Sequence, residues 1–554
     1  MEATINPEQI LQSYDIAVLA PELVLSFFAL AVLLVGAFFP DMKELRVFPG
    51  LAMAGTAVSI IATAALWNKN ATFGPPETAS YVADNFSLFF KWIFLIGLAV
   101  TILISKRFLT ARTGDRHTVI GEFFALLMLC TVGMMMVAAA TDLLVVFLGI
   151  ETFSIALYIL AGFARRRLMS NEASLKYFLL GAFATGFFLY GIALTYYATG
   201  STLLAQIADS IHSGKTYGMD RPIPMTFLQL GFAFILIGLG FKAALVPFHQ
   251  WTPDVYEGSP TPVTAFMAVG AKTAAFAAIL RVFAGAFSDP QISAQWHHLV
   301  LVIAVLTMTV GNVVAIAQDS LKRMLAYSSI AHAGYVLLGV LASATAIRSG
   351  ADADTIQKAN AGILFYLAVY ALMNLGAFAV LVYLEQARDA IDPDYDSEDA
   401  DMMVHEIGVL AWRSPLLAAA LTVFMLSLAG IPPTAGFFGK LYVFQSAVGQ
   451  QLIGLVIVGV LNTVISVYYY LRPIVVMYMQ EETEVAPAIA AVAASRGAAT
   501  ASAPTDPTFV PDFGFTFAVS VAIALCVLLM LAMSIAQAPV LDWAQEAATV
   551  LPKR

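Results

Sequence analysis

Long apolar stretches separated by short polar connections make up most of this chain. A membrane-spanning helix needs about 20 predominantly apolar residues, and the sequence contains about fourteen stretches of that length. These stretches lie near 17–39, 47–67, 84–105, 119–138, 142–163, 172–199, 225–248, 261–285, 296–317, 323–343, 356–387, 415–447, 451–479 and 513–537. We therefore predict an all-α polytopic membrane protein with about 14 transmembrane helices.

Two of the predicted spans contain helix-breaking residues beside a lysine. In GLGFKAALVPFHQW, Pro247 follows Lys242, and in SLAGIPPTAGFFGKLYVF, Pro432 and Pro433 precede Lys440. Proline removes a helical hydrogen bond, so we expect both helices to be discontinuous. Because one such lysine occurs in each half of the chain, the pattern is typical of transporters built from two inverted repeats.

The composition supports a membrane protein and excludes several other classes. The chain is 60% hydrophobic and only 12% charged, whereas soluble domains average about 25% charged residues. Much of the net charge of −9 comes from the acidic segment 389–401, and no basic patch indicates a nucleic-acid partner. The two cysteines are too few for a disulfide framework or a protein-ligated iron–sulfur cluster. Since nucleotide-binding and covalent-catalysis motifs are also absent, we expect no cofactor in this chain.

The distribution of lysine and arginine predicts the orientation in the membrane. These residues are more frequent in the odd-numbered connections, which include 165–171 and Lys322, than in the even-numbered ones, which include Lys215 and Arg281. Positive residues concentrate on the cytoplasmic side, so we predict cytoplasmic odd connections and both termini on the other side. The first apolar stretch begins near Ala17 without a basic flank or a clear cleavage site, which favours a retained span.

Among the charged residues inside the apolar stretches, five are candidates for function: Lys176, Lys242, Lys272, Lys440 and Glu151. A charge at the centre of a membrane helix costs about 2.5–3.5 kcal/mol on insertion scales, so it normally faces a wet or paired interior. Snorkelling to the membrane surface explains Lys272 and Lys242 poorly, because the first lies mid-span and the second precedes a helix break. The charges therefore predict a protein that moves ions, with protons favoured.

Lys242 and Glu151 are candidates for a coupled proton-transfer pair. Burial disfavours the charged form of a lysine, while a nearby carboxylate favours it, so a movable partner can switch the lysine between two states. Glu151 is the only mid-span carboxylate in the first half of the chain. Lys176 is also a possible relay with Glu172, four residues earlier on the same helix face, but an ordinary ion pair near the membrane surface explains these two residues equally well.

The remaining candidates are weaker. His249 and His332 could relay protons because histidine titrates near neutrality, although structural, hydrogen-bonded histidines are an equal alternative, and haem ligation by two such distant residues has little support. Glu22 and Glu122 lie near helix ends and are expected to be solvated or to cap the helices, with a functional role as the weaker alternative. Asp254 and Glu257 follow the break after Lys242, where capping is the default interpretation.

Five motifs together resemble one known family. DLLVVFLGIETFSIALYILAGF, RLMSNEASLKYFLLGAFATGFFLYG, GLGFKAALVPFHQWTPDVYEGSPTPVTAFMAVGAKTAAFAAILR, DSLKRMLAYSSIAHAGYVLLG and GIPPTAGFFGKLYVF occur in the family's order over roughly residues 120–475. They look like the antiporter-like membrane subunits of respiratory complex I. Within this family, SNEASLKYFLLG and SPTPVTAFMAVGAK favour one of the three antiporter-like paralogues.

The resemblance implies a domain organisation. It places an N-terminal three-helix segment at 1–118 and two inverted five-helix repeats at 119–285 and 296–479. The Ala/Pro-rich loop 480–512 and a C-terminal transmembrane helix with its tail, 513–554, follow. The acidic segment and this loop match no motif of the family, so the resemblance assigns them no role.

The resemblance also implies a function. In the family, Glu151, Lys242, Lys272 and Lys440 would form a central hydrophilic axis for protons. The chain would be a non-redox, proton-translocating subunit of NADH:quinone oxidoreductase in a bacterial inner membrane, coupled to quinone reduction elsewhere in the complex, with K-, J- and M-type membrane subunits as neighbours. The alternative is a subunit of an Mrp-type monovalent cation/proton antiporter. Sodium binding favours carboxylates and carbonyls, and the excess of buried lysines weighs against it. A passive scaffold would leave the buried charges unexplained.

Overall fold

The structure is a computed structural model, and it describes most of the chain. The described residues are 14–39, 47–113, 117–391, 402–408, 410–480 and 517–548. Most of the acidic segment 389–401, and all of the segment 480–512 except Gln480, lie outside them.

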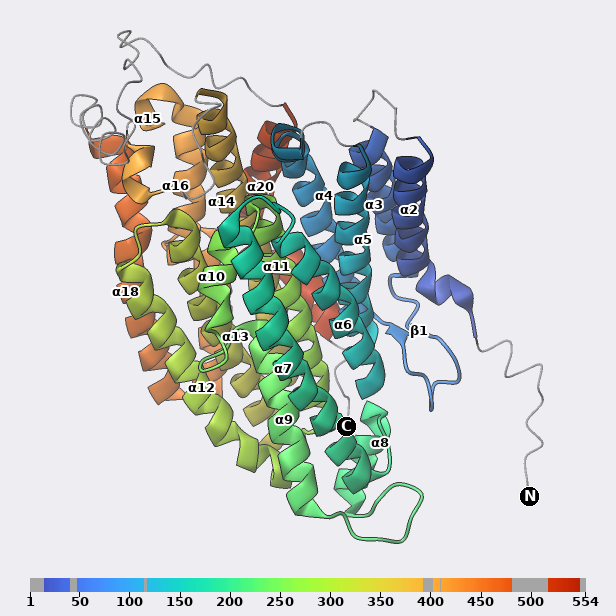
Figure 1. The fold of residues 1–554 in the computed structure, drawn as a ribbon. Helices are drawn as coiled ribbons and strands as arrows, with labels where there is room; N and C mark the ends of the chain where they lie inside the picture. The colour runs from blue at the N-terminus through green and yellow to red at the C-terminus, as the bar shows by residue number, and fades with distance from the viewer. Residues whose placement is uncertain are drawn as a thin grey trace.

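The described chain forms an elongated bundle of helices (Figure 1). Thirteen helices in this part of the chain are long and apolar enough to cross a membrane. They are α2 (Ala20–Phe38), α3 (Val47–Leu66), α4 (Asn85–Thr113), α5 (His117–Ala139), α6 (Leu143–Ala161), α7 (Leu168–Thr199), α9 (Met225–Ala243), α11 (Thr261–Ile279), α12 (Pro290–Ile316), α13 (Leu321–Arg348), α14 (Ala353–Ile391), α18 (Ile453–Met479) and α20 (Phe517–Ile535). The shorter helical elements are η1 (Ile16–Leu19), α8 (Leu204–Ser213), α10 (Trp251–Gly258), η2 (Leu280–Ala286), η3 (Val404–Ile407), α15 (Leu410–Arg413), α16 (Pro415–Ala429), α17 (Ala435–Gly449) and α21 (Gln537–Ala548). The prediction of an all-helical, multi-pass membrane protein is thereby confirmed.

The count of thirteen differs from the predicted fourteen because one predicted span forms two shorter helices. The stretch 415–447 corresponds to α16 and α17, each of 15 residues. Helix α16 ends at Gly430, whose φ of +81° is in the left-handed region that favours glycine. Two prolines follow within three residues and cannot donate the backbone hydrogen bonds that a continuing helix requires.

The stretch 225–248 is also interrupted. Helix α9 ends at Ala243, and Ala244 has a positive φ of 59°. The chain then runs through Pro247 without regular helix until α10 begins at Trp251. The freed backbone is partly satisfied locally, because the amide of Leu245 donates to the carbonyl of Gly240.

A small β-hairpin, which the sequence did not predict, connects α3 to α4. Its strands, β1 (Ala71–Thr72) and β2 (Val82–Ala83), pair antiparallel. Tyr81 beside β2 pairs with Ala140 after α5, and Asp142 before α6 pairs with Leu203 before α8. The hairpin and α8 therefore lie at one end of the bundle, called here the hairpin end, and α15 lies at the opposite end (Figure 1).

Helix α11 forms the centre of the molecule. Every residue of Thr261–Ile279 is buried, and the helix packs against α4, α5, α9 and α14. It continues into η2, a π-helical segment that is buried at all but one position. By contrast, α7 and α18 expose many large apolar side chains, as expected of helices that face lipid or neighbouring subunits.

Candidate functional site

Lys242 lies at the end of α9 inside an aromatic cage. Its side chain is buried, and its Nζ donates a hydrogen bond of 3.1 Å to the Tyr158 hydroxyl of α6. The same Nζ lies 5.3–5.9 Å from the ring centroids of Phe153, Tyr158, Tyr177 and Phe241. Aromatic rings attract a cation through their negative faces, so this environment can hold a charged lysine without a direct carboxylate partner.

The break after α9 builds one wall of this cage. Trp251, the first residue of α10, stacks on Tyr177 with centroids 4.4 Å apart and donates from its indole nitrogen to the carbonyl of Phe241. The hydroxyl of Tyr177 is buried without a hydrogen-bond partner among the described residues. The interruption of the helix therefore positions aromatic side chains around the lysine.

Glu151 lies near Lys242 on α6 but does not contact it. The carboxylate is half-buried and accepts a hydrogen bond of 2.8 Å from Thr185 of α7. No ion pair joins Glu151 to Lys242 in the described chain. Tyr158, which holds the lysine, is two turns farther along α6 and hence on the same face as Glu151. Glu151 and Tyr158, the hydrogen-bond partner of Lys242, are therefore carried by the same helix, α6.

Lys272 occupies the middle of α11. Its Nζ donates a hydrogen bond of 2.6 Å to the Ser329 hydroxyl of α13 and lies 5.9 Å from the ring centroid of Tyr256. The hydroxyls of Tyr256 and Thr273 beside it are buried and have no hydrogen-bond partner among the described residues. Lys272 therefore sits in a small polar region within the most deeply buried helix.

His332 lies one turn beyond this serine on α13, inside a group of hydroxyls. Its Nδ1 is 2.5 Å from the Tyr366 hydroxyl, and its Nε2 is 3.1 Å from the Tyr470 hydroxyl. The Tyr470 hydroxyl also hydrogen bonds Ser328, the neighbour of Ser329. A hydrogen-bonded series of Ser328, Tyr470, His332 and Tyr366 therefore lies next to the Lys272–Ser329 pair.

Lys440 is held by the second helix break. Lys440 lies on α17, and its Nζ donates to the carbonyls of Leu428 and Ala429 at 3.2 and 2.9 Å. These carbonyls belong to the last turn of α16, where the helix dipole and the unpaired acceptors favour a cation. The ring centroid of Tyr335 lies 4.9 Å from Nζ on another side.

Lys176 belongs to a half-exposed cluster toward the end of the bundle opposite the hairpin end. It forms ion pairs with Glu172 at 2.6 Å and with Asp254 at 2.7 Å. Arg323 of α13 binds Asp254 at 2.9 Å and Glu257 at 2.5 Å. Asp254 lies in the first turn of α10, as expected of a capping residue, but it and Glu257 also bind basic side chains that are distant in sequence. These groups line a pocket of about 200 Å³.

His249 lies in the connection between α9 and α10 and is half-buried. Its Nδ1 is buried without a hydrogen-bond partner in the described part of the chain. The two-turn spacing from Lys242 would have placed both residues on one face of a continuous helix. Since α9 ends at Ala243, that geometric relationship does not exist.

One buried ion pair was not predicted from the sequence. Lys91 of α4 is fully buried and forms an ion pair of 2.8 Å with Glu22 of α2. Glu22 lies in the first turn of α2 but is only 5% exposed, so the expectation that it is solvated was wrong. The signal for Lys91 was present, because the residue lies in FSLFFKWIFLIG within a predicted span.

Two further buried ion pairs involve residues that we had assigned to connections. Arg281 binds Asp84 at 2.6 Å, and Lys322 lies 3.5 Å from Glu385, whose oxygens also accept from Thr261. Arg281 and Lys322 were counted as loop cations in the orientation argument, and the structure buries both. The hydropathy pattern ends near these residues and cannot show that neighbouring helices cover them.

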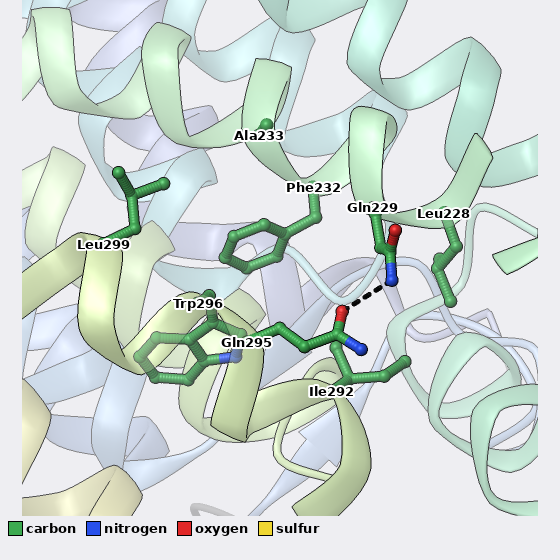
Figure 2. A pocket seen from close by; sticks show the side chains of 8 residues that line it. All are labelled: Leu228, Gln229, Phe232, Ala233, Ile292, Gln295, Trp296 and Leu299. Atoms are coloured by element: carbon green, nitrogen blue, oxygen red, sulfur yellow. Dashed lines mark hydrogen bonds between the residues drawn. The ribbon is translucent and has the colours of Figure 1, made fainter. Parts of the chain in front are cut away.

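A pocket of about 380 Å³ between α9 and α12 is separate from these charged groups. Figure 2 shows Gln229 hydrogen bonded to Gln295 and the ring of Phe232 over that of Trp296. No titratable side chain lines it, so it is not part of the candidate site.

Comparisons with known proteins agree with the motifs. A family model described as "NADH:quinone oxidoreductase/Mrp antiporter, TM" matches residues 140–466. The chain is 46% identical to NADH-quinone oxidoreductase subunit N from Trichlorobacter lovleyi over 480 residues, which cover 87% of this chain and 91% of the relative. It is 32% identical to a chain of respiratory complex I from Thermus thermophilus with bound aureothin, with a TM-score of 0.69 and coverage of 94% and 98%. A chain of the Mrp complex from Dietzia sp. has a TM-score of 0.74 over 96% and 97% of the two chains, but at 21% identity this likeness concerns the fold alone.

Proposed function

Because the chain belongs to the subunit N family of NADH-quinone oxidoreductase, the antiporter-like, proton-translocating membrane subunits of complex I, we propose that protons cross it through Glu151, Lys242, Lys272 and Lys440. One observation carries this assignment: the three lysines are 2–4% exposed within the bundle, yet each has its own polar or aromatic partners. A buried ionisable group in a membrane segment is a functional candidate by default.

The groups between the lysines suit proton transfer. Hydroxyl and imidazole groups can both accept and donate a proton, so they can relay it without an ion moving. Ser329 binds Lys272, its neighbour Ser328 binds Tyr470, which binds His332, and Tyr335 faces Lys440. These contacts support a lateral route from the first half of the chain to the second.

Internal water would complete this route. Several hydroxyl or imidazole atoms near the lysines are buried without a hydrogen-bond partner among the described residues. They belong to Tyr177, His249, Thr252, Tyr256 and Thr273. A buried polar atom is normally satisfied by protein or by ordered water. We therefore expect water molecules between Lys242 and Lys272.

Protons would enter the route from the end of the bundle opposite the hairpin end. The pocket around Lys176, Glu172, Asp254 and Arg323 is half-exposed and lined by charged groups. Such groups attract water and exchange protons readily. Lys176 and Glu172 would then act at the mouth of the route, while their ion pair also stabilises α7.

The two halves of the chain would act as inverted repeats. We infer a three-helix segment at 1–118, repeats at 119–285 and 296–479, and a final helix within 513–554 after the loop 480–512. The interruptions between α9 and α10 and between α16 and α17 support two discontinuous transmembrane helices, because each lies beside a buried lysine.

The chain is a multi-pass membrane subunit of a multi-subunit complex. We infer that it lies in the bacterial inner membrane, with the hairpin end and both termini on the non-cytoplasmic side. Neighbouring membrane subunits of the K, J and M types would cover its exposed apolar faces. The half-buried Glu151 supports such a neighbour, because an uncovered carboxylate would face lipid.

Proton pumping by the intact complex tests the assigned residues. Lys242→Met, Lys272→Met and Lys440→Met are each introduced, and NADH oxidation and proton uptake are measured in the same membrane vesicles. Assembled complexes should pump at a small fraction of the wild-type rate. Lys358→Met is the control, since Lys358 is exposed and paired only at the surface. Wild-type pumping by all three variants would remove the assignment.

An Mrp-type cation/proton antiporter is the second candidate, favoured only by the shared fold. The two functions differ in their response to sodium. An antiporter requires sodium or another monovalent cation for proton movement. A proton-translocating subunit of the oxidoreductase requires NADH oxidation instead.

A further inference from the structure

A second group of buried charges lies outside the proposed lysine route. It consists of Glu22, Tyr81, Asp84, Lys91 and Arg281, and we call it the hairpin cluster. All five side chains are buried, and they come from α2, the hairpin, the start of α4, and η2. The cluster therefore joins α2, the hairpin and α4 to the end of the central helix.

Three of these residues form a continuous donor–acceptor series. Lys91 Nζ donates to the Tyr81 hydroxyl at 2.7 Å, and that hydroxyl donates to Glu22 Oε1 at 2.6 Å. Lys91 and Glu22 also contact each other directly at 2.8 Å. An ammonium, a hydroxyl and a carboxylate in this order have the arrangement needed to pass a proton.

Arg281 and Asp84 join the start of α4, close to this series, to the continuation of the central helix. Arg281 binds Asp84 at 2.6 Å and donates to the carbonyl of Ala138 at 2.8 Å. Asp84 is three residues from Tyr81. Arg281 lies in the π-helical segment η2, and such segments are rare and occur frequently at functional sites.

The central helix places Lys272 above this pair. Lys272 and Arg281 are nine positions apart on α11 and its continuation, which corresponds to roughly 13 Å along the helix. The hydroxyl of Thr273, next to Lys272, is buried without a partner among the described residues. Helix α11 therefore carries Lys272 in the proposed route, and its continuation η2 carries Arg281 at the hairpin end.

Structural stability alone does not explain the hairpin cluster. Buried ion pairs are often no more stabilising than apolar side chains of the same size, because both charges lose their hydration. Here one oxygen of Glu22 and one of Asp84 are also buried without a hydrogen-bond partner among the described residues. Unsatisfied carboxylate oxygens destabilise a purely structural pair, but they suit a group that binds a proton or water.

We propose that Glu22, Tyr81 and Lys91 form a second proton-transfer site, which exchanges protons between the α11 axis and the hairpin end of the bundle, with Arg281 holding Asp84 in place beside it. This inference rests on the proposed function and adds a route that bypasses Lys440. In the step itself, Lys91 gives a proton to the Tyr81 oxygen while the Tyr81 hydroxyl proton moves to Glu22. A neutral amine, an unchanged phenol and a carboxylic acid result, and the reverse transfer restores the ion pair.

The state of Tyr81 fits this role. Burial raises the pKa of the Tyr81 phenol well above its usual value, and the neighbouring Glu22 carboxylate raises it further. Tyr81 is therefore a neutral hydroxyl at physiological pH. A neutral hydroxyl donates and accepts at once, whereas a phenolate could only accept.

A neutral double variant tests the proposal. Glu22→Gln/Lys91→Met removes both charges together and leaves no unpaired charge behind. We expect the complex to assemble and its NADH-driven pumping to fall by roughly a hundredfold or more, because an acid–base group typically contributes about 10²–10⁴-fold. Asp354→Asn/Lys358→Gln is the matched control, because it removes an exposed ion pair and should leave pumping unchanged.

Tyr81→Phe provides an independent measurement. It removes only the hydroxyl and leaves the direct contact between Lys91 and Glu22. Pumping should slow, and its solvent deuterium isotope effect should rise, because proton transfer at this site becomes more rate-limiting. A purely structural defect would not raise the isotope effect.

The possible outcomes separate this inference from the proposed function. An assembled double variant that pumps like wild type overturns the hairpin cluster as a proton site. If the double variant fails to assemble, wild-type pumping with an unchanged isotope effect in Tyr81→Phe overturns it instead. Lys272→Met is measured in parallel. A defect in Lys272→Met with normal hairpin-cluster variants removes this inference alone, whereas normal pumping by Lys272→Met contradicts the lysine route itself.

Discussion

Lys272 and Ser329 are joined by a hydrogen bond of 2.6 Å that connects the central helix α11 to α13. Ser329 is 57 positions away from Lys272 in the sequence, and both side chains are buried. The serine also donates to the carbonyl of Ala326 within its own helix. Its hydroxyl therefore has a fixed orientation and receives the lysine proton along a defined direction.

Ser329→Ala should slow proton pumping without preventing assembly. The substitution removes a hydrogen bond to a charged group, which contributes about 1.5–3 kcal/mol, and leaves Lys272 with its ammonium unsatisfied. Pumping and NADH oxidation in vesicles measure the effect. Ser534→Ala is the control, because Ser534 bonds only within its own helix at the periphery. Equal rates in Ser329→Ala and Ser534→Ala would show that the contact has no part in the route.

The local sequence predicted the buried lysines but not their partners. Lys242, Lys272 and Lys440 are recognisable because each interrupts an apolar stretch, and that signal is contained within a few neighbouring residues. Ser329 and Tyr158 are ordinary residues of their own helices. Only the packing of helices that are distant in sequence makes them partners, so no local pattern could identify them.

The transmembrane helices were predictable for a physical reason. Backbone groups within a bilayer must bond internally, so long apolar stretches form helices. The hairpin of two-residue strands and the π-helical segment η2 are too short to produce a periodic signal. For Glu22, a position near a helix end did not reveal whether water or another helix covers the side chain, whereas Lys91 was visible in the sequence and was overlooked.

Gly430→Ala should weaken the binding of Lys440 at the end of α16. Gly430 has a φ of +81°, a conformation that disfavours an added side chain by roughly 1–2 kcal/mol. A Cβ there would lie 2.9 Å from Lys440 Cδ, so the lysine would have to move. We expect lower thermal stability of the complex together with reduced pumping.

Gly454→Ala is the matched control for this substitution. A Cβ on Gly454 meets nothing within 4 Å, and its φ is not positive. The control should behave like wild type in both measurements. If Gly430→Ala retained full stability and full pumping, the close approach between α16 and Lys440 would be unimportant for the mechanism.

The predicted orientation can be measured with single cysteines. The connection 165–171 should be cytoplasmic, and the segment with Ser213 should face the other side. Arg166→Cys and Ser213→Cys are suitable because both positions are exposed, whereas Ser170 is buried. A membrane-impermeant thiol reagent added to intact cells should label position 213 only. Labelling of position 166 alone would reverse the orientation.

Lys242→Arg should fail to restore full pumping, although it keeps the positive charge. Arginine retains its proton under almost any burial, so it cannot alternate between proton-holding and proton-releasing states. Its planar guanidinium also fits poorly where the lysine Nζ meets the Tyr158 hydroxyl within four aromatic rings.

If Glu151 tunes Lys242 through α6, Glu151→Gln should depress pumping as well. The effects of Lys242→Met and Glu151→Gln should then be less than additive in the double variant. Pumping is measured per NADH oxidised in vesicles with matched amounts of assembled complex. Full activity in Lys242→Arg would mean that only a fixed charge is needed at this position, and strictly additive effects would mean that Glu151 and Lys242 act independently.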